Sequence, residues 1–237
     1  MKIIVIIPTL NEVENIASVT RIIDHGLKSM FQHDEVIIVN SDGGSTDGTT
    51  NKFLTTKTFF SKQVILDKKS TGKGNNIYNV LKKYRNEADY YLMIDADVIS
   101  AKSEWVNKLL NPLLENKAEL VIPMYRRNRY EGNTTNHFSS PLIYLCFDKY
   151  ISQPIAGEFS FTKKLARKIY KSFYCNSDFG YGIDTLITWT ALLENFRIVQ
   201  VRLGQKIHKP SFSKIVFMFD QVSNTTMYIQ CAWPKLR

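Results

Sequence analysis

Residues 90–97 read Tyr-Tyr-Leu-Met-Ile-Asp-Ala-Asp, an apolar run that ends in two carboxylates one residue apart. Such a run is typical of a strand that is buried on both faces. Asp95 and Asp97 can both point toward one ion beyond the strand end, since hard divalent cations take carboxylate oxygens together with substrate phosphate oxygens. Taken alone, the triplet also fits a strand-end turn in which Asp97 caps the next helix.

Three earlier apolar runs have the same organisation, because each is followed by small and polar residues. The runs cover residues 3–7, 36–39 and 63–66. The clusters after them are Pro8-Thr9-Leu10-Asn11-Glu12, Asn40-Ser41-Asp42-Gly43-Gly44-Ser45-Thr46-Asp47-Gly48 and Lys73-Gly74-Asn75-Asn76. In an open α/β sheet, ligands bind beyond the carboxyl ends of the strands. The four clusters therefore predict one continuous polar crevice.

Segments with helical spacing alternate with these runs, and this alternation predicts an α/β fold with a mostly parallel sheet flanked by helices. The expected helices cover residues 14–30, 49–54, 73–84, 103–116, 141–150, 163–173, 182–193 and 212–227, and two later strands cover 119–123 and 197–201. No repeat, linker or low-complexity tract divides the chain. We therefore expect a single domain over residues 1–237, with a first half (1–100) and a second half (101–237).

Composition excludes several classes of protein. The chain has 237 residues, 44% of them hydrophobic, and a formal net charge of +9, which is typical of a globular rather than a disordered chain. Its three cysteines are far apart and form no Cys-x-x-Cys pair, so a disulfide scaffold or zinc finger is disfavoured and reduced, buried thiols are expected. No run approaches the roughly 18 to 20 apolar residues of a membrane span, and we expect a cytoplasmic protein.

The positive charge is concentrated after residue 60, which suits an anionic ligand. Arg126, Arg127 and Arg129 follow a predicted strand and precede Gly132-Asn133-Thr134-Thr135-Asn136. Guanidinium groups bind phosphate and carboxylate with two parallel hydrogen bonds, so this loop is a candidate site for an anionic acceptor. A solvated basic loop is the alternative. Nucleic acid is not expected as a partner, because a basic face interleaved with aromatic residues is absent and only Tyr125 and Tyr130 flank the arginines.

With the four clusters in order, roughly the first 100 residues resemble the GT-A nucleotide-sugar glycosyltransferases of the family 2 type. The resemblance implies a GT-A fold and a UDP- or GDP-hexose donor. It implies that Asp97 holds Mg²⁺ or Mn²⁺ on the diphosphate. The residues that it places around the nucleotide sugar are Pro8, Leu10, Glu12, Asp42, Lys73 and Asp95.

The second half resembles a narrower group, the retaining glucosyl-3-phosphoglycerate synthases and their mannosyl relatives. The matching stretches are Gly132 to Asn136, Pro154-Ile155-Ala156-Gly157-Glu158, Gly180-Tyr181-Gly182-Ile183-Asp184 and His208. The resemblance implies that the Gly-x-x-Thr loop, with Gly132, Asn133, Thr134 and Thr135, holds a phosphoglycerate acceptor together with Arg126 and Arg127. It implies that His208 completes the metal site, and it allows a homodimer.

Two acidic residues are the catalytic candidates, Asp184 and Glu158. Asp184 occupies the position where that group is expected to carry the longer Glu. Either side chain can orient sugar hydroxyls, and Asp184 can also act as the base in an inverting reaction. Glu158 lies in a predicted turn before the helix at Lys163, and Asp184 lies at the start of a predicted helix, where an acid is favoured by the helix dipole alone.

The sequence thus predicts a metal-dependent glycosyltransferase that moves glucose or mannose from a nucleotide diphosphate sugar to a small anionic acceptor such as 3-phosphoglycerate. The alternative is an inverting family 2-type transferase that acts on a polyprenyl phosphate or a saccharide. A sugar-nucleotide pyrophosphorylase is disfavoured, because the cluster after the first strand lacks the Gly-rich, Arg-bearing loop of that class. A non-catalytic binding module is disfavoured by the intact Asp-x-Asp triplet.

Overall fold

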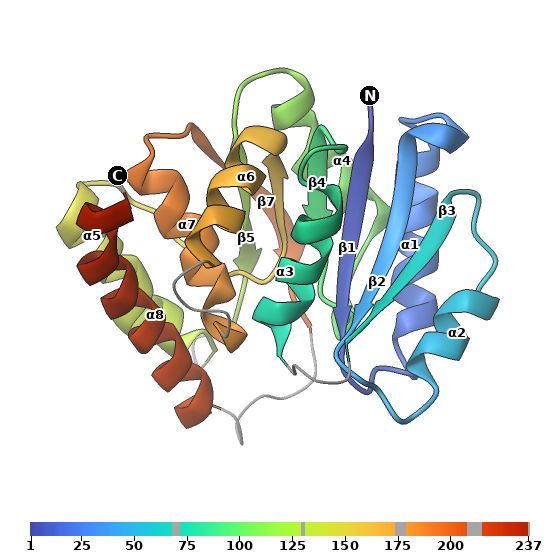
Figure 1. Cartoon of the computed structure of the whole chain (residues 1–237), viewed down its shortest axis with the longest axis horizontal. Coiled ribbons are helices and arrows are strands. Elements are labelled where there is room, and N and C mark those ends of the chain that lie inside the picture. The colour runs from blue at the N-terminus through green and yellow to red at the C-terminus, as the bar shows by residue number, and fades with distance from the viewer. Residues whose placement is uncertain (68–71, 129–130, 174–178, 208–214, 237) are drawn as a thin grey trace.

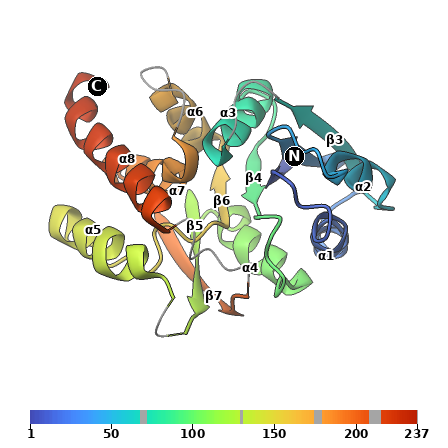
Figure 2. The same ribbon diagram turned by 90° about the horizontal axis from the view of Figure 1, so that it is seen from below.

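A computed structural model of the chain describes residues 1–67, 72–128, 131–173, 179–207 and 215–236. It has three layers, a central sheet with helices on both faces (Figure 1). The predicted α/β class with one domain is confirmed. Figure 2 views the molecule from the edge at which the first strand and its parallel neighbours end.

The sheet has seven strands in the order β3-β2-β1-β4-β6-β5-β7. The strands are β1 (Ile3–Thr9), β2 (Val36–Asp42), β3 (Ser61–Leu66), β4 (Tyr90–Met93), β5 (Leu120–Arg126), β6 (Phe159–Thr162) and β7 (Ile198–Gln205). All neighbouring pairs are parallel except those that involve β6. β1 is fully buried, as its unbroken β-branched run predicts.

Helices cover both faces of this sheet. In Figures 1 and 2, α1 (Ile16–Lys28) and α4 (Ser103–Leu114) lie on one face, and α3 (Lys73–Tyr84), α6 (Lys163–Ser172) and α7 (Ile183–Leu193) lie on the other. The remaining helical elements are α2 (Thr49–Thr55), α5 (Ser140–Phe147), α8 (Ile215–Leu236), the 3₁₀ turns η1 (His33–Glu35) and η4 (Gly180–Gly182), and the π-helical turn η2 (Thr135–Ser139).

Strand β6 was not predicted, because Gly157 and Glu158 indicated the start of a turn before the helix at Lys163. The strand has only four residues, yet Phe159 and Phe161 are fully buried. It runs antiparallel between β4 and β5, with Met93 opposite Phe159. This register brings the start of β6 to the carboxyl end of β4.

Three further expectations differ in detail. Helix α8 continues to Leu236, nine residues beyond the predicted end at residue 227. Cys146 and Cys231 are exposed, so the expectation of buried thiols was wrong for these two. Among the residues that the structure describes, no helix has both the length and the apolar composition that a membrane span requires.

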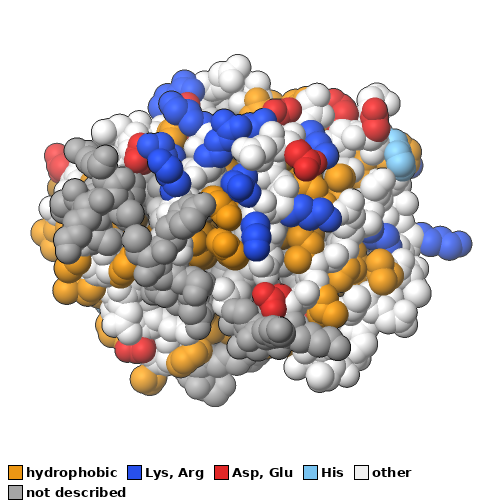
Figure 3. Space-filling model, in the orientation of Figure 1, with side chains coloured by type: hydrophobic (Ala, Val, Ile, Leu, Met, Phe, Trp, Pro, Cys, Tyr) orange, Lys and Arg blue, Asp and Glu red, His pale blue; other side chains and the backbone are white. Residues whose placement is uncertain are grey.

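The positive charge of the second half spreads over a surface of its own. Figure 3 shows Lys and Arg side chains gathered over the region of α3 and α6. The exposed basic residues of these two helices are Lys82, Lys83, Lys164, Arg167 and Lys171. The excess positive charge is therefore not confined to the Arg-rich loop.

Candidate active site

The loops after β1 and β2 are joined by side-chain hydrogen bonds. The Asn11 amide donates to Ser45 Oγ (2.8 Å), and the Thr46 amide donates to Asn11 Oδ1 (2.9 Å). The Glu12 amide donates to Thr49 Oγ1 (2.8 Å). These contacts hold the predicted nucleotide-side clusters together at one edge of the sheet.

Asp42 has a structural part in this edge. Its side chain is fully buried, and it accepts hydrogen bonds from the Gly44 and Ser45 amides (3.0 and 2.7 Å) and from the Thr50 hydroxyl. Pro8 is buried in β1, whereas Leu10 is 47% exposed beside it. Leu10 is therefore free to cover a ligand in the crevice, while Asp42 shapes the loop that would face it.

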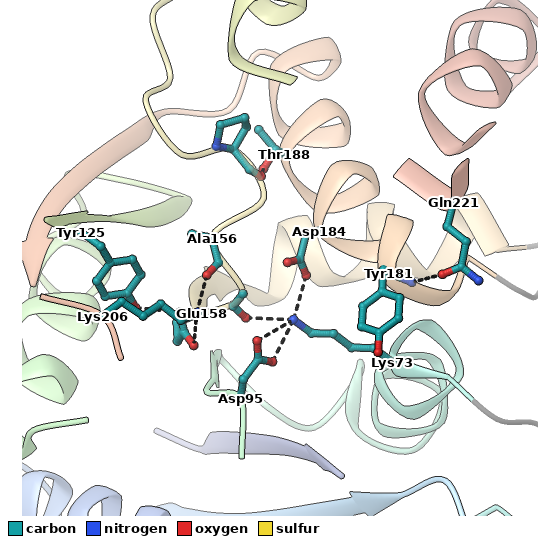
Figure 4. A network of polar contacts seen from close by, with 12 residues as sticks. Lys73, Asp95, Tyr125, Ala156, Glu158, Tyr181, Asp184, Thr188, Lys206 and Gln221 are labelled. Carbon is teal, nitrogen blue, oxygen red and sulfur yellow. Dashed lines mark hydrogen bonds and ion pairs between the residues drawn. The ribbon is translucent and has the colours of Figure 1, made fainter. Parts of the chain in front are cut away.

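Lys73 lies at the centre of the site (Figure 4). Its Nζ is 2.8 Å from Asp95 Oδ1 and 3.0 Å from Asp184 Oδ1. It also donates to the Gly157 carbonyl oxygen at 3.2 Å. These partners come from α3, the end of β4, the start of α7 and the segment before β6. Lys73 thus joins both halves of the chain.

The ion pairs shift the ionisation of this cluster. Burial by itself lowers the pKa of Lys73, but the charges of Asp184 and Asp95 outweigh it and raise that pKa well above its ordinary value. Burial raises the pKa of Asp184 to about 6, helped by the charges of Asp95 and Glu158 and opposed by Lys73. Lys73 is therefore a fixed cation, and Asp184 is a carboxylate that titrates close to neutral pH.

A second lysine, Lys206, was missed by the sequence analysis. Its Nζ donates to both carboxylate oxygens of Glu158 (2.9 and 2.8 Å) and to the Ala156 carbonyl oxygen (2.8 Å). Glu158 is fully buried and also accepts a hydrogen bond from the Tyr125 hydroxyl at 2.7 Å. Burial raises the pKa of Glu158, although Lys206 opposes the shift. The only sequence signal for Lys206 was its position two residues before His208.

The segment between the two lysines leaves no room for a side chain. The Ala156 carbonyl oxygen accepts a hydrogen bond from Lys206, and the Gly157 carbonyl oxygen accepts one from Lys73. Gly157 has a φ of +96°, and a Cβ on it would lie 2.4 Å from Asp95 Oδ2 and 3.0 Å from Lys206 Nζ. Glycine is required here both for the backbone conformation and for the close approach of Asp95.

Close packing of glycines also sets the position of Asp184. A Cβ on Gly74 of α3 would lie 3.0 Å from the Gly180 amide nitrogen, and one on Gly182 would clash with the Thr225 side chain of α8. The Tyr181 amide donates to Gln221 Oε1 of α8 at 2.8 Å (Figure 4). The turn η4 is thus held between α3 and α8, and α7 with Asp184 begins directly after it.

The charges around Asp95 fit a divalent cation. Two buried lysines face three carboxylates, those of Asp95, Asp184 and Glu158, and the half-buried Asp97 adds a fourth. With all groups ionised this set has an excess of two negative charges, and carboxylate oxygens are ligands of the kind that Mg²⁺ and Mn²⁺ prefer.

The predicted third metal ligand, His208, lies outside the described residues. Its neighbour Ile207 is described, and the Ile207 carbonyl oxygen accepts from the Ile99 and Ser100 amides at 2.9 and 3.3 Å. The chain therefore passes beside the segment that follows Asp97. Within the described part of the chain, no three His, Cys, Asp or Glu side chains are grouped as a metal site.

The predicted acceptor loop begins at the end of β5. Arg126 is exposed, whereas Arg127 is half-buried and packs beneath Gly132, with its Nη1 3.1 Å from where a Cβ on that glycine would be. Arg127 Nε is buried with no hydrogen-bond partner within the described residues. Burial lowers the pKa of Arg127, while the charge of Glu158 raises it. An inward-facing cation with an unused donor suits an anionic ligand.

The rest of that loop is only partly accessible. Asn133 is exposed, Thr134 is half-buried, and Thr135 is 2% exposed at the start of η2. Arg129 lies outside the described residues. The structure thus brings together Lys73, Asp95, Asp184 and Glu158 from the predicted set, with Arg127 nearby on the Tyr125 side. It leaves Leu10, Arg126 and Asn133 at the surface.

Comparisons with known proteins agree with this geometry. The model of the family "Glycosyl transferase family 2" matches residues 4–183. Glucosyl-3-phosphoglycerate synthase of Mycolicibacterium smegmatis is 28% identical over 220 residues, which cover 86% of this chain and 69% of that protein. Mannosylglycerate synthase of Selaginella moellendorffii is 24% identical over 149 residues, 58% of this chain and 34% of that protein.

A solved structure gives the same result in three dimensions. The crystal structure of glucosyl-3-phosphoglycerate synthase from Mycobacterium tuberculosis with phosphoglyceric acid has a TM-score of 0.74 and 25% identity, and the match covers 95% of this chain and 78% of that one. The same mycobacterial enzyme has been solved with Mn²⁺, UDP and glucosyl-3-phosphoglycerate, and this structure has a TM-score of 0.74. The family model, the fold and the order of the strand-end clusters agree, and this chain belongs to glycosyl transferase family 2.

Proposed function

We propose that this glycosyltransferase moves a hexose, glucose or mannose, from a nucleotide diphosphate sugar to 3-phosphoglycerate or a similar small anionic acceptor, with Mg²⁺ or Mn²⁺ as cofactor. The observation that carries the proposal is the cluster of two lysines paired with three carboxylates at the strand ends, with Asp97 close by in sequence and the inward-facing Arg127 on its second-half side. UDP is the preferred nucleotide, since the mycobacterial relative is solved with UDP.

The charge balance of the site supports a bound cation. A nucleotide diphosphate is itself anionic, and a carboxylate-rich crevice would repel it. Asp97 and His208 would hold the metal ion, which supplies positive charge for the leaving diphosphate. Asp97 follows Asp95 by two residues at the end of β4, where Asp95 pairs with Lys73, and this placement beside the sugar-diphosphate side of the site supports the assignment.

The protein's own residues then have separate tasks. Leu10, Pro8 and Glu12 would line the base pocket, and Asp42 would act by shaping the loop beside it. Lys73 and Asp95 would lie next to the sugar diphosphate. Asp184, paired with Lys73 and held by η4, would orient sugar hydroxyls. Because both Glu158 oxygens are engaged inside the protein, we assign Glu158 a supporting part rather than a contact with the sugar.

The acceptor would bind where the second half meets the sheet. Arg127 supplies an unused donor, and Gly132, with a φ of +73°, allows backbone amides of the loop to approach a ligand. Arg126, Asn133, Thr134 and Thr135 would complete this side. A compact phosphate or carboxylate suits such a site better than a neutral sugar does.

A product assay tests the proposal. The protein is incubated with UDP-glucose or GDP-mannose, Mn²⁺ and 3-phosphoglycerate, with glycerol as the uncharged acceptor. We expect a glycosylated phosphoglycerate with at least one donor and a much lower rate with glycerol. Proton NMR of the product then gives the anomeric configuration, for which we expect retention. Equal rates with both acceptors would contradict an anionic acceptor, and transfer only to a polyprenyl phosphate would favour the membrane-acceptor alternative.

A further inference from the structure

Tyr125, near the end of β5, lies between two cations that belong to different sides of the site. Its ring centroid is 5.2 Å from Lys206 Nζ and 5.9 Å from the Arg127 guanidinium carbon. The ring is 6% exposed and packs against Trp105 at 5.3 Å. Arg127 follows directly after β5, and its guanidinium lies against the same ring. One rigid ring therefore contacts a cation on the proposed acceptor side and a cation on the donor side.

The hydroxyl of the same ring reaches the centre of the site. It donates to Glu158, whose carboxylate holds Lys206 with both oxygens. A lysine has three N–H donors, and Lys206 uses its third on the Ala156 carbonyl oxygen. Lys206 therefore has no donor left for a ligand, and its position depends on Glu158. The hydroxyl of Tyr125 is the neutral donor that fixes the orientation of that carboxylate (Figure 4).

The support extends from Lys206 to the proposed donor site through the Gly157 turn. The close approach of Gly157 to Asp95 and Lys206 means that a shift of either neighbour moves the turn. The Gly157 carbonyl oxygen accepts from Lys73, which pairs with Asp95 and Asp184. The contacts around Glu158 are buried and those around Lys73 are part-buried, and packed interiors transmit such displacements rather than absorb them.

We propose that Tyr125 is a positioning residue that couples binding of the anionic acceptor beside Arg127 to binding of the nucleotide sugar beside Lys73, through Glu158, Lys206 and the Gly157 turn. The inference rests on the proposed function for the identity of the two ligands. The ligand that binds first orders these shared residues. The second ligand therefore binds with a smaller loss of conformational entropy. Coupling of this kind is reciprocal between the two sites.

Binding measurements test the coupling without turnover. The affinity for 3-phosphoglycerate is measured by calorimetry with and without saturating UDP and Mn²⁺. For the unmodified protein we expect UDP to tighten acceptor binding about fivefold or more, the lower end of typical allosteric coupling. For Tyr125→Phe we expect the ratio to fall below about twofold, because the ring stays and only its hydrogen bond to Glu158 is lost.

Tyr91→Phe is the matched control. The Tyr91 side chain is also fully buried on the sheet, and its hydroxyl donates to the Tyr84 carbonyl oxygen at 2.8 Å, outside the site. Tyr91→Phe should lower the melting temperature about as much as Tyr125→Phe does. It should nevertheless keep the ratio of 3-phosphoglycerate affinities, with and without UDP, that the unmodified protein has. Glu158→Gln is the second test variant, since it keeps the shape of the side chain and weakens the hold on Lys206, and it should also lower the ratio.

The outcomes separate the two levels of inference. If the unmodified protein binds neither UDP nor 3-phosphoglycerate, the proposed function fails, and the coupling fails with it. If it binds both and Tyr125→Phe keeps the full ratio, only the coupling is wrong. An equal loss of the ratio in Tyr91→Phe would also overturn it, because the effect would then report general loosening of the sheet.

Discussion

The two halves of the chain reach the same crevice by different routes. In residues 1–100, the polar clusters after β1, β2 and β4 directly follow their strands, and those after β1 and β2 bond to each other across the sheet edge, as Asn11 does to Ser45 and Thr46. In residues 101–237, the site residues come from the start of an antiparallel strand, the start of α7 and the end of β7. Their positions depend on packing between segments that are distant in sequence.

This difference separates two kinds of site. The edge formed by the turns after β1 and β2 is held by hydrogen bonds between those two turns, so a substitution there should change the ligand that it contacts and little else. The second-half residues share supports, such as the Gly157 turn and the contacts between α8 and η4. A substitution there should affect several ligands or residues together. The following experiments test this division, from the largest expected effect to the smallest.

Asp97→Asn should give the largest effect. The substitution keeps the size of the side chain and removes the charge that would hold the cation. We expect near-complete loss of transfer and of Mn²⁺-dependent nucleotide binding, with an unchanged melting temperature for the protein without ligand. Asp34→Asn, at an exposed position in η1, is the control and should retain activity. Wild-type activity of Asp97→Asn in excess chelator would show that the metal assignment is wrong.

Arg127→Ala should mainly weaken binding of the acceptor. A lost charge-assisted hydrogen bond costs roughly 1.5 to 3 kcal/mol, which corresponds to about a 10-fold to 150-fold higher KM for 3-phosphoglycerate. The KM for the donor should change much less. Arg126→Ala should have a smaller effect, because Arg126 is exposed while Arg127 is turned inward. Thr135→Ala should also have a smaller effect, because its hydroxyl is neutral. A change in donor KM alone would place the loop on the nucleotide side.

His208→Ala tests whether a second-half residue contributes to a first-half ligand. If His208 supports the metal that Asp97 holds, Mn²⁺ affinity should fall about 10-fold to 100-fold, as for other supporting ligands. High Mn²⁺ should restore part of the activity. His33→Ala is the control, because His33 is exposed and distant in sequence from His208, and its Mn²⁺ affinity should not change. A Mn²⁺ titration that superimposes on that of the unmodified protein would remove His208 from the metal site.

The pH dependence of kcat/KM should show the smallest effect. If the ionised form of Asp184 is required, activity should rise with an apparent pKa near 6, because burial raises the pKa of Asp184 to about 6. Glu158→Gln removes a nearby negative charge that contributes to this shift, so the acidic limb should move to lower pH. If kcat/KM instead rises with an apparent pKa of about 4, the ordinary value of an exposed carboxylate, then Asp184 is not the titrating group.

The division between halves also explains what the sequence could predict. The strands β1, β2 and β4 are apolar runs with polar ends, so their positions and their shared crevice followed from local patterns. Strand β6 has only four residues beside a helix start, and its pairing with β4 depends on distant contacts that no local pattern records. For the same reason Glu158 was expected at a sugar rather than buried against Lys206, and Tyr125 carried no signal at all.

Helix α8 has a consequence for where this enzyme can be cut or recombined. The family model ends at residue 183, before Asp184 and before α8. Yet Gln221 and Thr225 of α8 form the wall against which Gly180 and Gly182 are packed. In a chimera that joined residues 1–183 to the C-terminal part of a relative, Gly180 and Gly182 would pack against the relative's helix instead of α8. Compatibility of such hybrids is therefore decided at the contact between a two-glycine turn and one helix, more than at the junction itself.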